Sequence, residues 1–311
     1  MKRIICLVSF CTLLLAYSKN ATAQYYFYDD DYYDTPVLFE IGASIGAMNC
    51  LTDIGGNKGI GKRFIKDLNL GKTSFCAGVF INAMYKNAVG LRLEGTFGKL
   101  SANDNVLSGV KEFDIARARY NRNTSFRTNI TEISLVTEIH PLFIFINYQE
   151  RESDPPRMSP YLLAGVGYYS FNPQAQLKSS GKWVDLQPLS TEGQGFTKYT
   201  DKKVYKLQQM NYPVGLGIKY ELSSTVNLRG EFVYRVLQTD YLDDVSTTYS
   251  DPLWYPEFFT GTKLSNALEM RDRQISKDTG PGGKRGSPKQ KDAFFSFNVK
   301  LSLTIGRQRI R

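Results

Sequence analysis

The chain has 311 residues, of which 42% are hydrophobic, and its formal net charge is +9. Beyond the N-terminal region, no segment approaches the run of about 18 apolar residues that a membrane-spanning helix needs, so a helical membrane protein is excluded. Three of the positive charges lie in that N-terminal region, and the remaining +6 is too small to indicate a nucleic-acid-binding protein. It would suit contact with the anionic surface that lipopolysaccharide presents.

The first 23 residues have the three parts of a secretory signal peptide. Lys2 and Arg3 form the charged start, residues 4–16 the apolar stretch, and residues 21–23 (Ala-Thr-Ala) the cleavage site. We therefore expect an exported chain that begins at Gln24. The next segment, 24–36, is acidic and rich in tyrosine, and it lacks the alternation of a strand. We expect it to form a mobile periplasmic arm.

Eight stretches of alternating apolar and polar residues follow, which is the pattern of strands with one apolar face. The last is the clearest, because apolar residues from Phe295 to Ile305 alternate with polar residues from Ser296 to Thr304. For 160–171 the pattern does not decide which residues face outward. In chain order the predicted strands are 37–48, 73–85, 89–97, 126–145, 160–171, 204–222, 226–236 and 295–305.

The connections between these stretches alternate between short and long. The four long ones are 49–72, 100–125, 172–203 and 238–291, and the glycine- and proline-rich part 276–291 is expected to be disordered. The fold prediction is all-β, an eight-stranded antiparallel transmembrane β-barrel over 37–306 with short periplasmic turns, four long extracellular loops and a C-terminal tail, 307–311. A soluble β-sandwich shows the same alternation. Apolar faces of about ten residues opposite charged faces favour the membrane barrel.

The barrel interior predicted from this alternation is charged. Because unpaired charges are costly to bury, five acids and five bases on the inner face predict a network of ion pairs. Such a network would fill a barrel of eight strands, whose bore is narrow, and would favour a structural plug over a conducting pore. The ten residues are Glu40, Glu94, Glu132, Glu138, Glu231, Arg92, Lys219, Arg229, Arg235 and Lys300.

Residues with catalytic chemistry are few. His140 is the only histidine, and the predicted topology places it at the periplasmic end, away from the outer leaflet where a barrel lipase, acyltransferase or protease would act. We interpret it as structural. The sequence therefore predicts no enzyme and no cofactor.

Two cysteines, Cys50 and Cys76, flank the first long loop on the inward-facing parity of adjacent strands. In an oxidising compartment they could form a disulfide, worth roughly 3 kcal/mol on the chain-entropy model. Two free thiols are an equal alternative.

Two charged clusters lie in the long loops. Carboxylates at the start of the fourth loop could hold calcium, but their spacing lacks the glycine and terminal glutamate of an EF-hand, so local turn capping is favoured. Basic residues around the second loop could contact lipopolysaccharide phosphates, with a solvated charged loop as the default. The acidic cluster is Asp240, Asp243, Asp244 and Asp251, and the basic one is Lys111, Arg117, Arg119, Arg122 and Arg127.

Two loop segments carry a resemblance to a known family. They read Thr-Glu-Gly-Gln-Gly and Thr-Asp-Tyr-Leu-Asp-Asp-Val-Ser, within a similarity that extends over 39–249. The chain resembles the PorG-like family of outer-membrane barrels, components of the type IX secretion system of Bacteroidota. It departs from the pattern at Thr52, where glycine is expected, and in a long basic insertion after Tyr249. The motif residues are Thr191, Glu192, Gly193, Gln194, Gly195, Thr239, Asp240, Tyr241, Asp243 and Asp244.

The resemblance implies a non-enzymatic outer-membrane component that ties the periplasmic ring (PorK and PorN) to the membrane, in machinery that exports folded proteins and supports gliding in some members. The aromatic arm would then contact the ring. The alternatives are a surface-binding, adhesive or lipopolysaccharide-contacting barrel of the OmpA/OmpX-like type, and a barrel enzyme. The proposed ring-contact residues are Tyr25, Tyr26, Tyr28, Tyr32 and Tyr33.

Overall fold

A computed structural model describes residues 36–56, 70–114, 116–146 and 156–305, and the structural statements below concern these ranges. The expected signal peptide, the tyrosines of the N-terminal arm and the C-terminal tail lie outside the described residues.

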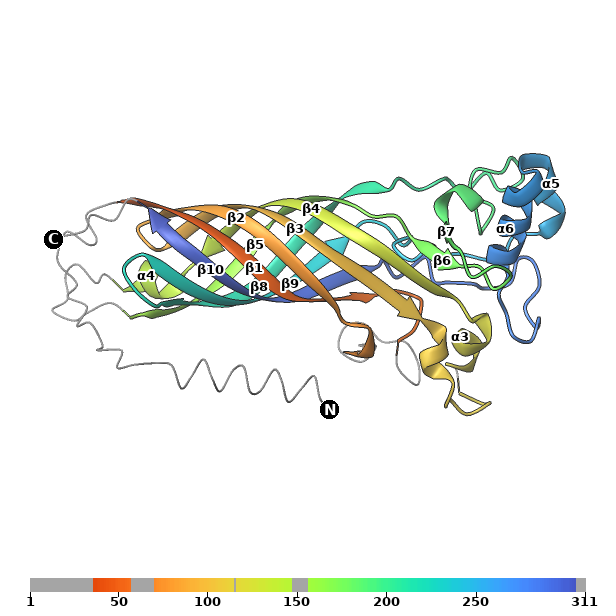
Figure 1. Ribbon diagram of the computed structural model, residues 1–311, viewed down its shortest axis with the longest axis horizontal. Helices are drawn as coiled ribbons and strands as arrows, with labels where there is room; N and C mark the ends of the chain where they lie inside the picture. The colour runs from red at the N-terminus through yellow and green to blue at the C-terminus, as the bar shows by residue number, and fades with distance from the viewer. Residues whose placement is uncertain (1–35, 57–69, 115, 147–155, 306–311) are drawn as a thin grey trace.

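Eight long antiparallel strands of the described ranges form a closed barrel (Figure 1). Each strand pairs with its neighbour along the chain, and the last closes on the first, with Phe39 opposite Ile305. The prediction of an all-β eight-stranded barrel is confirmed. The strands are β1 (Val37–Leu51), β2 (Ser74–Tyr85), β3 (Val89–Asn103), β4 (Ser125–Ile139), β5 (Met158–Ser170), β8 (Gln208–Glu221), β9 (Val226–Leu237) and β10 (Ala293–Ile305).

The outside of the barrel is apolar and the inside is polar. Ile45, Val79 and Ile133 are each at least 60% exposed on the outside, whereas Glu138 and Lys300 are fully buried inside. A soluble sandwich would bury the apolar face instead, so this wall is suited to lipid. In β5, whose facing the sequence left open, Ser159, Tyr161 and Leu163 point inward, while Leu162 and Val166 point outward.

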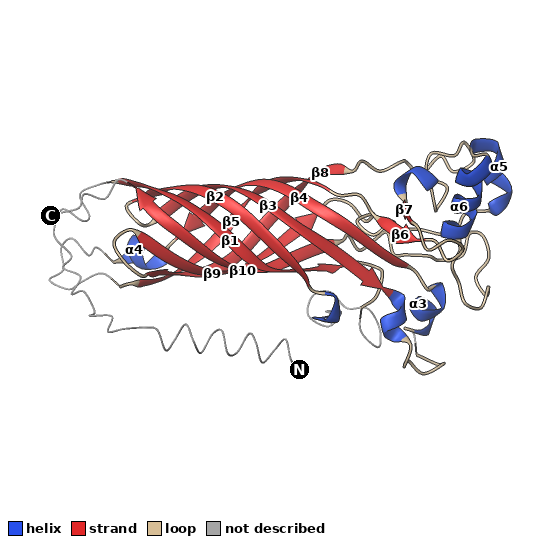
Figure 2. Cartoon of the chain, in the orientation of Figure 1, coloured by secondary structure: helices blue, strands red, loops and turns tan. Residues whose placement is uncertain are grey.

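The two ends of the barrel differ (Figure 2). At the turn end, β2 and β3 are joined by a tight turn in which Lys86 and Asn87 both have positive φ, 49° and 55°, as a type I′ hairpin requires. The same end holds the β8–β9 connection and the short helix α4 (Pro141–Phe145). The described parts of the long connections lie at the opposite end, the loop end.

The loops contain more regular structure than the sequence predicted. A small hairpin of β6 (Gln174–Gln176) and β7 (Trp183–Asp185) extends the wall beside β4. No helix in the described part of the chain is both long and apolar enough to cross a membrane. The loop helices are α3 (Arg117–Arg122), α5 (Tyr255–Phe258) and α6 (Gly261–Arg271), with 3-10 turns at Leu70–Lys72, Asp104–Leu107, Gln187–Leu189 and Pro252–Trp254.

Strand boundaries differ where local chemistry intervenes. The predicted strand 126–145 ends at Ile139, because Pro141 cannot donate to a strand ladder and instead begins α4. The predicted strand 89–97 continues to Asn103, paired with Ser125, so the wall extends further toward the loop end on this side.

We call the described parts of the loops at 104–124, 171–207 and 238–292 the cap. An apolar cluster joins its third and fourth loops, in which Phe196 stacks on Phe258 at 4.2 Å between ring centroids. The prediction that 276–291 is disordered was wrong: Arg285 is buried, and its backbone N–H donates to the Thr247 carbonyl at 2.9 Å. Glycine and proline mark turns in a sequence, but they do not show which partners the turns meet.

Candidate functional site

The interior network, defined as the ten charged residues predicted inside the barrel, is assembled by every barrel strand except β2 and β5. At its centre Glu138 accepts hydrogen bonds from Arg92 and from Arg229, whose Nη1 lies 2.8 Å from Oε2. Glu231 lies 2.8 Å from Arg92 Nη1 and 2.8 Å from Lys300 Nζ. These contacts connect strands on different sides of the barrel through its middle.

The remaining members are also paired. Glu40 binds Lys219 Nζ at 2.7 Å and also pairs with Arg229. Glu94 accepts from Lys300 Nζ at 2.6 Å. Closer to the loop end, Glu132 and Arg235 form a separate pair at 2.8 Å. The five acids and five bases are therefore all brought into contact with an opposite charge.

Neutral side chains complete the filling. The ring of Phe80 lies 5.3–5.7 Å from Arg92, Arg229 and Lys300, within reach of cation–π attraction. The Tyr161 hydroxyl donates to Glu231 at 2.8 Å. Sequence reasoning did not single out these two aromatics. The inward parity of Phe80 on β2 was a usable signal, whereas the undecided facing of β5 gave none for Tyr161. The interior is a charge-balanced plug, with its residues bound to one another.

His140 lies at the turn end, where the sequence placed it, but its ring is buried within the mouth. It stacks on Tyr161 at 4.9 Å, and its Nδ1 lies 2.9 Å from Ser159 Oγ. A Ser–His contact is a component of hydrolytic sites, and Glu138 is 3.6 Å from Nε2. The adjacent hollow has a volume of only about 10 Å³, however, which leaves no room for a substrate. The geometry supports the structural interpretation.

The cap is held by a buried carboxylate from the first motif. Glu192 accepts from the backbone N–H groups of Ser246 and Thr247 at 3.0 and 2.9 Å, and from Arg285 Nη1 at 3.0 Å. The Tyr241 hydroxyl also donates to Glu192 Oε2, at 3.3 Å. One side chain of the third loop thus binds two segments of the fourth.

A second junction lies beside it. Thr191 Oγ1 donates to Asp244 at 2.5 Å, and the Tyr205 hydroxyl donates to the other oxygen of that carboxylate at 2.8 Å. Gly193 and Gly195 both have φ of +79°, and a Cβ on Gly193 would lie 2.5 Å from the ring of Tyr199. The two motif segments are therefore one structural unit, with glycine required for the tight approach.

Three further motif residues make hydrogen bonds in the same region. Gln194 accepts from the Glu192 backbone N–H at 3.0 Å. The Thr239 carbonyl accepts from the Asp292 backbone N–H at 3.1 Å. Asp243 accepts from the backbone N–H groups of Ile54 and Val245 at 3.0 and 2.9 Å, so it caps turns.

Burial raises the pKa of three of these carboxyl groups. The pKa of Asp240 rises to about 8, with Asp53 and Asp243 nearby adding repulsion. Burial and Asp53 raise that of Asp243 to about 7. Burial raises that of Asp244 to about 6, although Arg285 opposes the change. Within the described ranges, no group of three or more histidine, cysteine or carboxylate side chains is placed to hold a metal ion.

A cavity of about 650 Å³, the loop cavity, opens between the second and fourth loops. Arg117, Arg119 and Lys284 line it, and Asp53 and Asp278 contribute the acidic groups. The expectation that the whole basic stripe is solvated was wrong for Arg122, which is buried and pairs with Asp104 at 2.8 Å. That pair anchors the second loop, and Arg117 and Arg119 of the stripe line the cavity beside it.

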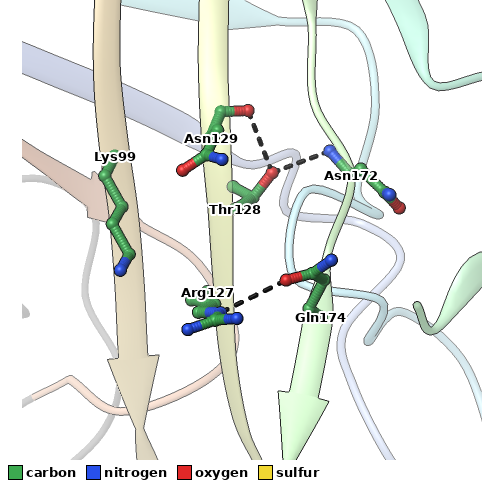
Figure 3. A pocket seen from close by; sticks show the side chains of 6 residues that line it. All are labelled: Lys99, Arg127, Thr128, Asn129, Asn172 and Gln174. Atoms are coloured by element: carbon green, nitrogen blue, oxygen red, sulfur yellow. Dashed lines mark hydrogen bonds between the residues drawn. The ribbon is translucent and has the colours of Figure 1, made fainter. Parts of the chain in front are cut away.

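A smaller pocket of about 280 Å³, the wall pocket, lies at the rim of the barrel wall (Figure 3). Lys99 and Arg127 come from adjacent strands, and Gln174 comes from β6. Arg127 Nε donates to Gln174 Oε1 at 3.2 Å. This member of the basic stripe is therefore separated from the loop cavity.

The disulfide is not formed, and both thiols are free and buried. Cys76 pairs with Gly46 in the β1–β2 register, which puts Cys50 four residues further along β1. Four residues of a strand span about 13 Å, well beyond the Cα separation of about 7 Å that a disulfide tolerates. The shared inward parity of these cysteines was correct, but parity does not fix their separation.

Neither a protein-family model nor a curated protein sequence matches the chain. Among solved structures, the chain is similar to Neisserial surface protein A, at 8% identity over 85% of this chain and 96% of that one, with a TM-score of 0.38. It is similar to Ail of Yersinia pestis in complex with the heparin analogue sucrose octasulfate, at 7% identity over 86% and 97%, with a TM-score of 0.35. It is also similar to a major outer membrane protein from Thermus thermophilus, at 12% identity over 86% of this chain and 99% of that one, with a TM-score of 0.37. The barrel architecture of this chain is established by its own strand pairing.

Proposed function

We propose that this protein is a non-enzymatic outer-membrane barrel that works at the cell surface by binding an anionic ligand in its loop cavity. The observation that carries the proposal is the contrast between the barrel interior and the cap. The interior network is filled and charge-balanced, whereas the cap is ordered around an open cavity with an excess of cations. A barrel with this interior is suited to holding the cap at the membrane.

The membrane placement combines two features. The apolar outer wall needs lipid, and the export signal in residues 1–23 directs the chain out of the cytoplasm. With the N-terminus in the periplasm, the turn end lies inside and the cap faces outward. This orientation also brings the cap to the level of lipopolysaccharide.

The ligand class follows from the groups at the cavity. Arginine side chains bind sulfate, phosphate and carboxylate groups through two parallel hydrogen bonds. Arg117 and Lys284 have no carboxylate partner among the described ion pairs. The cap is already ordered by its internal contacts, so little chain entropy is lost when a ligand binds.

The test uses a heparin oligosaccharide as a polyanionic probe for the detergent-purified protein, with binding measured by calorimetry at low and high salt. The wild type is expected to bind, and the Arg117→Gln/Lys284→Gln variant to bind at least about tenfold more weakly. The Lys182→Gln/Lys206→Gln variant removes two exposed positive charges outside this cavity and is expected to bind as the wild type does. Equal affinity in all three proteins would overturn the proposal.

A second candidate is the type IX secretion role that the motif resemblance implies. The observation that favours it is that the two most specific motif segments bind one another through Glu192 and through Thr191 with Asp244. The two motif segments together therefore stabilise one cap structure. A family whose members bind the same partner would be expected to keep such a structure. In this reading the barrel anchors the PorK/PorN-like ring, and the tyrosines of the arm make the contact.

The second candidate has its own test. Deletion of residues 25–34 should weaken co-purification of the ring proteins in mild detergent and impair secretion, while the barrel still folds. Unchanged recovery of the ring proteins would count against this role. The Arg117→Gln/Lys284→Gln variant should keep the ring proteins, which separates the two functions.

A further inference from the structure

The wall pocket faces outward from the barrel. In β4, Phe126, Thr128 and Ile130 are buried, so the alternating positions Arg127 and Asn129 lie on the outer side. Lys99 is opposite Asn129 in the β3–β4 register and is exposed in the same way. The pocket is therefore separated by the barrel wall from the interior network.

The pocket lies at the boundary of the apolar belt. The next outward-facing residue on β3 toward the turn end, two positions from Lys99, is Phe97, which lies opposite Thr131. The outward-facing residue after Thr131 on β4 is Ile133. Phe97 is 56% exposed and Ile133 is 62% exposed. Lys99 and Arg127 are the first charged side chains beyond this belt on the two strands. In a membrane, that is the level of the headgroups of the outer leaflet.

The two cations are close to each other without a compensating acid. Lys99 and Arg127 occupy diagonal positions on neighbouring strands, about 7–8 Å apart at the backbone. Among the described residues that line the pocket, none is a carboxylate, and neither cation forms an ion pair with one. Asp185, the nearby acid of the hairpin, accepts from Gln174 Nε2 at 2.7 Å instead. Unbalanced positive charge of this kind attracts an anion.

The pocket is also preorganised. The Arg127 guanidinium stacks 3.6 Å from the centre of the Trp183 ring. Figure 3 shows the hydrogen bond by which Gln174 fixes the Arg127 Nε. Thr128 Oγ1 accepts from the Asn172 backbone N–H at 2.8 Å, which clamps the segment after β5 to β4. An arginine held by stacking keeps its terminal N–H groups free for a planar or tetrahedral anion. Trp183 is 42% exposed, as an aromatic at a membrane interface is.

We infer that Lys99 and Arg127 bind the phosphate of a phosphorylated lipid in the outer leaflet, with the acyl chains of that lipid against Phe97 and Ile133. The inference rests on the proposed function only for the outward orientation of the cap. It assigns the wall a ligand of its own, separate from that of the loop cavity. The shared chemistry is a phosphate group, which a free phosphate ion could also supply.

The experiment measures retention of lipid on the detergent-purified barrel by native mass spectrometry. The probes are bisphosphorylated lipid A, its dephosphorylated form, and inorganic phosphate in large excess as a competitor. The wild type is expected to retain the bisphosphorylated form at about tenfold lower concentration than the dephosphorylated form. Inorganic phosphate should not displace it, because the acyl contacts are missing from the free ion.

The variants decide where the lipid binds. Lys99→Gln/Arg127→Gln should remove the preference for the phosphorylated form. Lys99→Arg, which keeps both charges and the stacked arginine, should keep it, and Arg117→Gln/Lys284→Gln should leave it unchanged. Each variant is first shown to fold by its heat-dependent mobility in gels. The inference is wrong if Lys99→Gln/Arg127→Gln retains the preference, or if inorganic phosphate displaces the lipid fully. Loss of heparin binding in Arg117→Gln/Lys284→Gln tests the proposed function independently.

Discussion

Arg285 and Glu192 form a buried ion pair, with Nη1 and Oε1 3.0 Å apart, although 93 residues separate them in the chain. The pair joins segment 276–291, which the sequence predicted to be disordered, to the Thr-Glu-Gly-Gln-Gly motif of the third loop. It explains why the third and fourth loops form one cap. The same arginine also donates to the Asp244 carbonyl at 2.7 Å, so both motif segments depend on it.

Removing the acid of this pair should open the cap and leave the barrel intact. Glu192→Gln leaves the buried Arg285 with Asp244, 4.0 Å away, as its remaining carboxylate partner, at a cost of about 3 kcal/mol. Trypsin should then cleave at Lys284 and Lys289 about 100-fold faster, because cleavage follows the open population. Glu257→Gln, an exposed acid of the same cap, is the control and should be cleaved at the wild-type rate. Equal rates in both variants would show that the pair does not hold the cap.

The interior network should be essential to barrel stability. Glu138→Leu leaves Arg92 and Arg229 without their shared partner and should lower the free energy of unfolding by about 3–5 kcal/mol. Urea unfolding in detergent micelles measures this loss. The exposed Glu112→Gln should change stability by less than about 0.5 kcal/mol. If Glu138→Leu is as stable as that control, the carboxylate does not hold the arginines.

The cap should be more stable in mild acid than at alkaline pH. In the folded state Asp240 has a pKa of about 8 and Asp243 of about 7, raised by burial above the ordinary value near 3.8. Between the ordinary value and these raised values the folded state binds more protons than the unfolded state, so stability falls as the pH rises. Both tryptophans, Trp183 and Trp254, lie in the cap, and their fluorescence on heating reports its unfolding.

From pH 5.5 to 8 we expect the cap to lose stability, by at most about 5 kcal/mol if both groups titrate fully in this window. Asp240→Asn removes a buried titrating group and should flatten this dependence and raise stability at pH 8. A wild-type cap that becomes more stable as the pH rises through this window would contradict the assignment.

The two buried thiols should be protected from reagents. In the folded protein without reductant, Cys50 and Cys76 should not react with a maleimide, and after denaturation both should be labelled. Mass spectrometry counts the additions. Two unmodified cysteines after denaturation without reductant would mean that a disulfide forms, and the register of β1 on β2 would then have to be wrong.

Period-two alternation was sufficient to predict the barrel and the ten interior charges, because one residue of slip would have exposed every charged face to lipid. It could not predict the cap. The contacts of Glu192 with Ser246, Thr247 and Arg285 join residues whose loops carry no periodicity. The distance between Cys50 and Cys76 could not be predicted for a similar reason. Alternation shows whether a residue faces inward or outward, but it does not show the register of one strand on the next. The wall pocket also depends on Trp183, which belongs to a hairpin that the sequence did not reveal.

The central claim is that the barrel is closed and that its work is done on its outer surface. Single-channel recording of the purified protein in planar lipid bilayers tests it most directly. We predict insertion without steady conductance steps, because the interior network of Glu138, Arg92, Arg229 and their partners fills the bore. A large and steady conductance in the wild type would contradict the account.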